Sequence, residues 1–192
     1  MGKDTTHNTF LSYSRKDYDI VRKIKQEIEQ ATKAKCRMDL EGISYRSPDF
    51  TKIIAPAIEQ ASIFVFILTP NSQRSRYARN ELLLAKTRNK HIFFVEPREC
   101  EMTSEFILEY GHYNKSLYYA DYQRRKLYEE LLELLTTVEN DSYKDKQESI
   151  NEIVQIGDSF YYADQYAAAI PYYIKAAELG NSSAQNNLIL EV

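Results

Sequence analysis

Five short segments of the chain have the apolar pattern of β-strands. Two are continuous apolar runs, residues 63–68 and 91–95, and such runs are typical of central strands buried on both faces of a parallel sheet. Shorter strands are expected at residues 8–13, 35–39 and 117–119. The hydrophobic pattern therefore predicts a five-stranded sheet in the first part of the chain.

Helices are expected between the first four strands and after the fifth, where apolar residues recur every three or four positions. They span residues 17–31, 48–61, 75–89 and 122–135. Pro56 lies inside the second helix and should kink it or shift its start. Strands that alternate with helices of this length are joined by crossovers, so the sequence predicts an α/β fold: a flavodoxin-like parallel sheet with helices on both faces.

The last quarter of the chain has a different pattern. We expect a domain at residues 8–136, a linker or frayed polar helix at 137–148, and a short all-α helical tail at 149–192. Gly180 should end a tail helix in a left-handed cap.

Residues 169–188 of this tail resemble a Sel1-like or tetratricopeptide repeat. So few repeats cannot bury their own apolar faces, because about three are normally needed. We therefore expect the tail to pack on the first domain, on another protomer, on a protein partner, or on further repeats of a longer array.

Composition and charge exclude several classes of function. Hydrophobic residues make up 43% of the 192 residues and the net charge is only -3, which argues against binding to nucleic acid or an anionic membrane through bulk charge. The N-terminus lacks the apolar core of a signal peptide, and no apolar run is long enough to span a membrane, so a cytoplasmic protein is expected. Cys36 and Cys100 are isolated, which predicts reduced, packed thiols and no structural metal.

Five motifs occur in an order that resembles the TIR (Toll/interleukin-1 receptor) domain family. The motifs are Phe10-Leu11-Ser12-Tyr13-Ser14 in the first strand, Asp39 with Gly42 after the second, Phe50 in the next helix, Thr69-Pro70 after the third strand, and Ser75-Arg76-Tyr77-Ala78-Arg79-Asn80-Glu81-Leu82. Two departures from the family pattern occur. Tyr77 stands where the family usually has Trp, and a commonly present second Gly is missing before Phe50.

The resemblance implies an enzyme that cleaves NAD+ at the nicotinamide–ribose bond, with Glu81 as the catalytic carboxylate. NAD+ would be the substrate, with no further cofactor and no metal. Because ligands of parallel sheets bind at the carboxyl ends of the strands, we expect the substrate to contact a set of residues near that edge. These predicted substrate-binding residues are Tyr13, Ser14, Arg15, Gly42 and Tyr77.

Each of these residues also has a purely structural interpretation. Glu81 is either catalytic or a solvated helix residue, and Tyr77 is either a stacking surface or a packing residue. Ser14 either contacts substrate or caps the first helix. Arg15 is either a phosphate contact or surface charge, and the arginines at 74, 76 and 79 either steer a dinucleotide or form a solvated face.

Two functional hypotheses follow from the resemblance. The first is a prokaryotic NAD+ hydrolase or cyclase of a stress or antiphage response, which releases nicotinamide and either ADP-ribose or a cyclic isomer. The second is a non-catalytic adaptor that self-associates and docks a partner through its tail. In both cases the family implies self-association through the TIR domain, including the loop Leu40 to Ser47.

Overall fold

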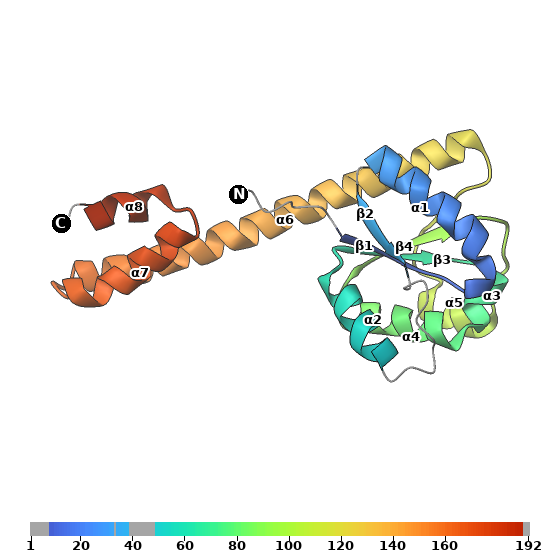
Figure 1. The fold of residues 1–192 in the computed structure, drawn as a ribbon, viewed down its shortest axis with the longest axis horizontal. Coiled ribbons are helices and arrows are strands. Elements are labelled where there is room, and N and C mark those ends of the chain that lie inside the picture. The colour runs from blue at the N-terminus through green and yellow to red at the C-terminus, as the bar shows by residue number, and fades with distance from the viewer. Residues whose placement is uncertain (1–7, 33, 39–48, 190–192) are drawn as a thin grey trace. The chain divides into compact units, whose positions relative to one another are not determined.

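The computed structural model describes residues 8–32, 34–38 and 49–189 (Figure 1). Its core is a sheet of five parallel strands in the order β2-β1-β3-β4-β5. The strands are β1 (Asn8–Ser12), β2 (Lys35–Met38), β3 (Ile63–Ile67), β4 (His91–Glu96) and β5 (Lys115–Leu117). The predicted flavodoxin-like α/β fold is confirmed, with each strand within a few residues of its expected position.

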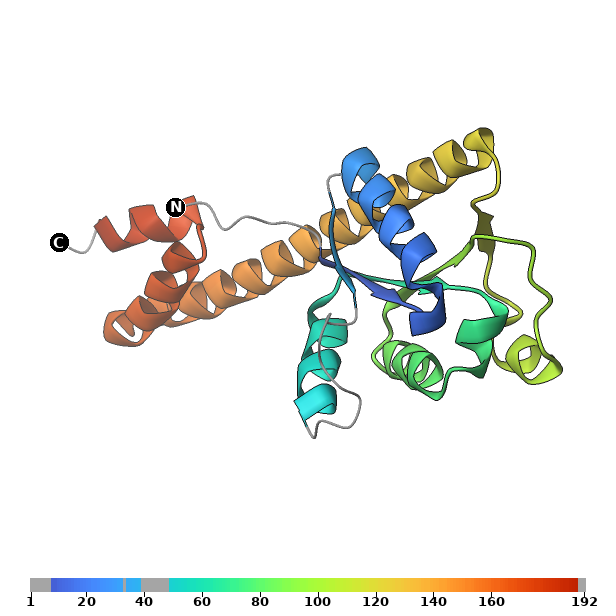
Figure 2. The same cartoon turned by 45° about the vertical axis from the view of Figure 1, so that its right-hand side comes forward.

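Helices cover both faces of this sheet. The helices of the described residues are η1 (Arg15–Asp17), α1 (Tyr18–Thr32), α2 (Asp49–Gln60), α3 (Pro70–Arg74), α4 (Arg76–Thr87), α5 (Ser104–Tyr110), α6 (Asp121–Tyr161), α7 (Tyr166–Glu178) and α8 (Ser182–Ile189), of which those before residue 136 belong to the unit that contains the sheet. Figures 1 and 2 show α1 and the first turns of α6 on one face, and α2 and α4 on the other. Pro56 lies within α2, which is assigned as one helix from Asp49 to Gln60.

Side chains along each strand point alternately to the two faces of the sheet, and this alternation decides which of them contact α2 and α4. Phe10, Phe64, Phe66 and Phe94 are fully buried in one cluster with residues of α2, α4 and α5. Successive side chains of a strand point to opposite faces, so Ser12 leaves β1 on the same face as Phe10. The end of β1 therefore directs a hydroxyl group toward α4.

The segment between β3 and β4 differs from the single helix expected at 75–89. Thr69 begins α3 with a reciprocal capping box with Ser72, and Pro70 occupies its first turn. Ser75 then adopts an extended conformation (φ -76°, ψ 113°), and its side chain accepts a hydrogen bond from the Ala78 amide at the start of α4. The hydrophobic pattern did not indicate α3 or α5, because both are short.

Helix α6 continues far beyond the expected end at residue 135. It is helical to Tyr161, and residues 137–148, expected as a linker or a polar helix, lie within it. These residues have no Gly or Pro to end a helix, and they are largely exposed, which explains the lost periodicity. No helix in the described part of the chain has the length and apolar character needed to cross a membrane.

The chain divides into two compact units, residues 1–136 and 137–192. In the second unit, Tyr173 of α7 is buried, and its hydroxyl donates a hydrogen bond to Asp158 Oδ1 over 2.7 Å. Gly180 has a positive φ of 99°, which confirms its predicted left-handed conformation. The Gly180 and Asn181 amides donate to the Ala177 and Ala176 carbonyls, the pattern of a Schellman cap.

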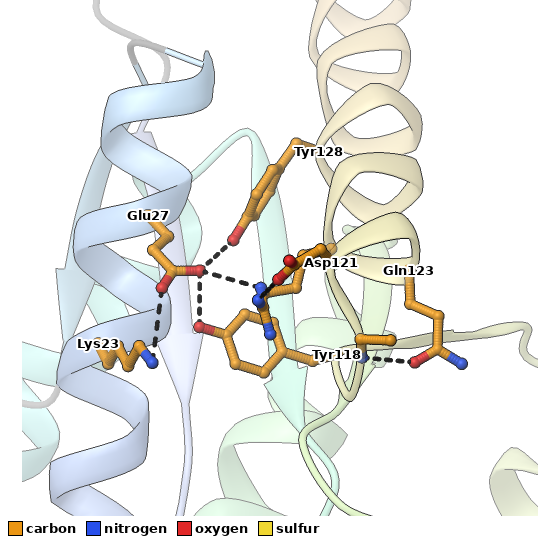
Figure 3. Close-up of polar contacts among 8 residues, drawn as sticks. Lys23, Glu27, Tyr118, Asp121, Gln123 and Tyr128 are labelled. Atoms are coloured by element: carbon orange, nitrogen blue, oxygen red, sulfur yellow. Dashed lines mark hydrogen bonds and ion pairs between the residues drawn. The ribbon is translucent and has the colours of Figure 1, made fainter.

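A polar cluster around Glu27 joins α1 to the end of the sheet and to α6 in the first unit (Figure 3). Glu27 Oε2 accepts hydrogen bonds from the hydroxyls of Tyr118, over 2.7 Å, and Tyr128. Burial acts to raise the pKa of Glu27, but these hydrogen bonds and the charges of Lys23 and Arg124 outweigh it, so the pKa lies below the ordinary glutamate value of 4.5. The ionised carboxylate therefore stabilises the folded domain.

We predict that Glu27→Gln lowers the free energy of unfolding by about 1–2 kcal/mol at neutral pH, because a hydrogen bond to a charged acceptor is replaced by a neutral one. A carboxyl group whose pKa is lowered by folding stabilises the folded state at pH values above its unfolded-state pKa. This stabilisation is lost as the pH falls through the folded-state pKa. The difference between wild type and variant should therefore shrink below about pH 4.5. Urea unfolding at several pH values measures it, with Glu129→Gln, at an exposed site on α6, as the control. A pH-independent difference would contradict this assignment.

Candidate active site

A buried hydrogen bond between the sheet and α4 is the centre of the candidate site. Ser12 Oγ, at the carboxyl end of β1, donates to Glu81 Oε2 over 2.6 Å. Ser12 is fully buried and Glu81 is only 6% exposed. A buried carboxylate is costly unless it is hydrogen-bonded. The alternative that Glu81 is a solvated helix residue is therefore wrong.

Glu81 is buried because it lies on the sheet-facing side of α4. Its neighbours on this side, Ala78, Leu82 and Ala85, are fully buried in the cluster beneath α4. Ala78 and Ala85 are small, so the helix can approach the strands closely. The sequence of α4 thus brings one carboxylate into an otherwise apolar layer.

A pocket of about 160 Å³ opens beside Glu81, between α2 and α4. Its lining residues are Ile54, Ala55 and Ile58 of α2, and Tyr77, Asn80, Glu81 and Leu84 of α4. Glu81 is the one carboxylate among these described lining residues. Tyr77, one helical turn before Glu81, is 41% exposed. The structure thus brings together an aromatic ring and a carboxylate in a mostly apolar hollow.

The residues that follow β1 are near Ser12 in sequence but do not line this pocket. Tyr13 and Ser14 are buried, whereas Arg15 is exposed in η1. Ser14 lies at the N-cap position of η1, where its side chain makes no capping hydrogen bond. Gly42, Asp39 and the loop Leu40 to Ser47 lie outside the described residues.

A second polar contact ties the loop after β1 to the loop after β3. Thr69 Oγ1 donates to Asp17 Oδ2 over 2.6 Å, and Asn71 Nδ2 donates to Asp17 Oδ1 over 2.7 Å. Because β1 and β3 are neighbours in the sheet, these bonds hold the carboxyl ends of the two strands together. The position of Ser12 relative to α4 depends on this edge.

Neither cysteine has the properties of a nucleophile. Cys36 and Cys100 are buried free thiols. Burial, and then the charge of Glu29, raises the pKa of Cys36 to about 12, and burial also raises the pKa of Cys100. Both therefore carry a protonated thiol at neutral pH.

The sequence did not indicate Ser12 as the partner of Glu81, nor Asn80 and Leu84 as pocket residues. The signal for Ser12 was its spacing of two from Phe10 on β1, which fixes the face of the sheet that it occupies. The pocket walls came from packing between α2 and α4, which are separated in sequence and whose pairing no local pattern indicates.

Ser12→Ala should remove one hydrogen-bond donor from the buried carboxylate, and we predict a loss of about 1–3 kcal/mol in the free energy of unfolding at neutral pH. A double-mutant cycle with Glu81→Gln isolates the interaction and should give a coupling energy of about 1 kcal/mol or more. Ser104→Ala, at an exposed site, is the control. A coupling energy of zero would show that the hydrogen bond does not contribute to stability.

Comparison with known proteins agrees with this architecture. A family model described as "TIR domain" matches residues 9–136. No curated protein matches the chain significantly. Among solved structures, the TIR domain of the Toll-related receptor TRR-2 from Hydra magnipapillata is 15% identical, with a TM-score of 0.56, and the match covers 68% of this chain and 99% of that one.

Two further solved structures have lower scores. The 2-desoxiribosyltransferase from Leishmania mexicana is 7% identical with a TM-score of 0.47, over 64% of this chain and 97% of that one. The CMP N-glycosidase BcmB from Clostridium botulinum is 17% identical with a TM-score of 0.43, over 62% of this chain and 97% of that one. Likeness at these levels is too weak to support a statement about activity. The family match, by contrast, covers more than half of the chain, and the protein therefore belongs to the TIR domain family.

Proposed function

We propose that the protein is a TIR-type NAD+ hydrolase that cleaves the bond between nicotinamide and ribose. The observation that carries the proposal is the buried Glu81 carboxylate, held by Ser12 at the wall of a pocket that Tyr77 also lines. Membership of a family that includes NAD+ hydrolases agrees with this chemistry. Glu81 is proposed as the catalytic residue and Tyr77 as a substrate-binding residue.

The reaction requires one carboxylate and no general acid. Nicotinamide in NAD+ is already cationic, so the bond from ribose C1′ to the ring nitrogen breaks with its electron pair going to the nitrogen, and neutral nicotinamide leaves. Positive charge then develops on the ribose, and an anionic carboxylate beside it stabilises this transition state. Attack by water gives ADP-ribose, and attack by a ribose or adenine group of the same molecule gives a cyclic isomer. An O-glycosidase, by contrast, needs a second carboxyl group to protonate its leaving oxygen.

The surroundings of Glu81 suit this role. Ile54, Ile58 and Leu84 give the pocket apolar walls, and electrostatic interactions are stronger where water is excluded. Ser12 holds Glu81 by one oxygen and acts as a positioning residue. Tyr77, partly exposed on the same helix face, offers a ring on which a flat pyridinium can stack.

Tyr13, Ser14, Arg15 and Gly42 remain proposed substrate contacts. The first three immediately follow Ser12, whose hydroxyl contacts Glu81. Gly42 belongs to the loop Leu40 to Ser47, which we propose as part of a self-association surface. A cytoplasmic role in a prokaryotic stress or antiphage response is likewise our proposal, and it follows from the family and from the tail.

The alternative is a non-catalytic adaptor whose second unit docks a partner. It is favoured by large apolar side chains that are exposed in that unit: Ile156, Tyr161, Tyr162, Tyr166, Ile174 and Leu179. The assignment of residues 149–192 to a Sel1-like or tetratricopeptide repeat remains a prediction, since the family match ends at residue 136. An adaptor of this kind has no need of a buried carboxylate beside a pocket.

We predict that Glu81→Gln lowers kcat for NAD+ cleavage by about a hundredfold or more, because the charge that stabilises the transition state is lost. KM should change much less. Release of nicotinamide by the purified full chain measures both constants. Glu129→Gln is the matched control, since it removes the same charge from an exposed helical site. If the folded Glu81→Gln protein keeps a kcat close to that of the control, Glu81 is not catalytic.

Replacement of Tyr77 separates stacking from packing. Tyr77→Ala should lower kcat/KM by about tenfold or more, whereas Tyr77→Phe and Tyr77→Trp, which keep an aromatic face, should stay near wild type. Tyr122→Ala, which removes an exposed ring from α6, is the control. Equal kcat/KM for Tyr77→Ala and this control would make Tyr77 a spectator.

A further inference from the structure

Three arginines surround a second hollow on α4, next to the pocket that contains Glu81. This hollow, which we call the arginine hollow, has a volume of about 300 Å³. Arg74, Arg76 and Arg79 line it together with Asn80, Leu83 and two residues of α5, Glu109 and Tyr110. It therefore lies between α4 and α5, whereas the Glu81 pocket lies between α2 and α4.

These arginines lie at the positively charged end of α4, which is electrostatically unfavourable unless an anion is bound there. Arg76 and Arg79 lie in the first turns of α4, and Arg74 precedes its N-cap by one residue. The N-terminus of a helix carries partial positive charge and favours acidic side chains, yet α4 has no acidic residue in its first turn. Departures of this kind from local electrostatics are expected at functional sites.

Acidic side chains nearby neutralise this charge only in part. Arg79 Nη1 lies 3.6 Å from Glu105 Oε2, but the Glu105 side chain is 80% exposed, so this contact is weak. Glu109 is the one acid among the described lining residues. Within the part of the chain that the structure describes, Arg74 and Arg76 form no ion pair. The arginine hollow therefore has an excess of positive charge that an anion would balance.

Asn80 connects the arginine hollow to the Glu81 pocket, because it lines both. A single ligand that crosses α4 at Asn80 can thus place one group at Glu81 and another among the guanidinium groups. The planar fork of Arg binds phosphate oxygens through paired hydrogen bonds.

We propose that the arginine hollow binds a pyrophosphate group, namely the diphosphate of a dinucleotide whose ribosyl end lies at Glu81. The inference rests on the proposed function, and it adds the subsite that would select a dinucleotide over a nucleoside. In this arrangement Arg76 and Arg79 contact the phosphates, and Arg74 adds charge from the end of α3.

Inorganic pyrophosphate, titrated into the full chain by calorimetry, tests the binding site without any need for catalysis. Arg76→Gln/Arg79→Gln should weaken its binding by about tenfold or more, since two charge-assisted contacts are lost. The control is Arg22→Gln/Arg125→Gln, which removes the same charge from exposed sites on α1 and α6. Arg76→Gln alone, at an exposed site, provides a second variant if the double substitution lowers the melting temperature.

Steady-state kinetics then identifies the natural source of the phosphate groups. With NAD+ as substrate, the Arg76→Gln/Arg79→Gln protein should show a KM raised by about tenfold while kcat changes much less, because the subsite binds ground and transition states alike. An unchanged KM together with weakened pyrophosphate binding would overturn the substrate assignment and leave a site for a free anion.

The remaining outcomes separate this inference from the proposed function. If pyrophosphate binds through the arginines but the protein cleaves no NAD+, the anion site stands and the hydrolase proposal fails. A different outcome is that the protein cleaves NAD+, but Arg76→Gln/Arg79→Gln binds pyrophosphate as tightly as the control Arg22→Gln/Arg125→Gln, or the wild type does not bind pyrophosphate at all. In either case the arginine hollow is not a phosphate subsite, and the hydrolase proposal is unaffected.

Discussion

The hydrogen bond from Ser12 to Glu81 links the two elements on which the candidate site depends, the end of β1 and the sheet-facing side of α4. It keeps a carboxylate beside a cluster of buried apolar and aromatic side chains. A carboxylate held at the wall of an apolar pocket is the kind of group that stabilises a developing cation.

Helix α4 carries different chemistry on each of its faces. One face packs on the sheet and includes Glu81, one directs Tyr77 to a pocket against α2 that Glu81 also lines, and one directs Arg76 and Arg79 to a hollow against α5. Asn80 lies where the last two meet. The extended Ser75, which separates α3 from α4, sets where this helix begins and so which residues occupy each face. The carboxylate and the cationic cluster, which lie on two sides of one helix, are the basis on which we propose a dinucleotide as the ligand.

Local patterns in the sequence were sufficient to predict the sheet. The apolar runs at 63–68 and 91–95 became the buried β3 and β4, and Glu81 with Tyr77 could be chosen by motif. The short helices α3 and α5 were missed because one or two turns give too few apolar repeats to detect. The pairing of Ser12 with Glu81 spans 69 positions and depends on the packing of α4 on β1, which no local pattern contains. The same is true of the Glu27 cluster, whose tyrosines lie at 118 and 128.

The central claim is that this chain breaks the nicotinamide–ribose bond of NAD+. The most direct measurement is a proton NMR time course of the purified full-length protein with NAD+, recorded over a range of protein concentrations so that any dependence on self-association is included. We predict that the signals of free nicotinamide grow as those of NAD+ decline, with equal amounts of nicotinamide formed and NAD+ lost. Intact NAD+ at every protein concentration, in the presence of a folded protein, would contradict the account and favour the adaptor.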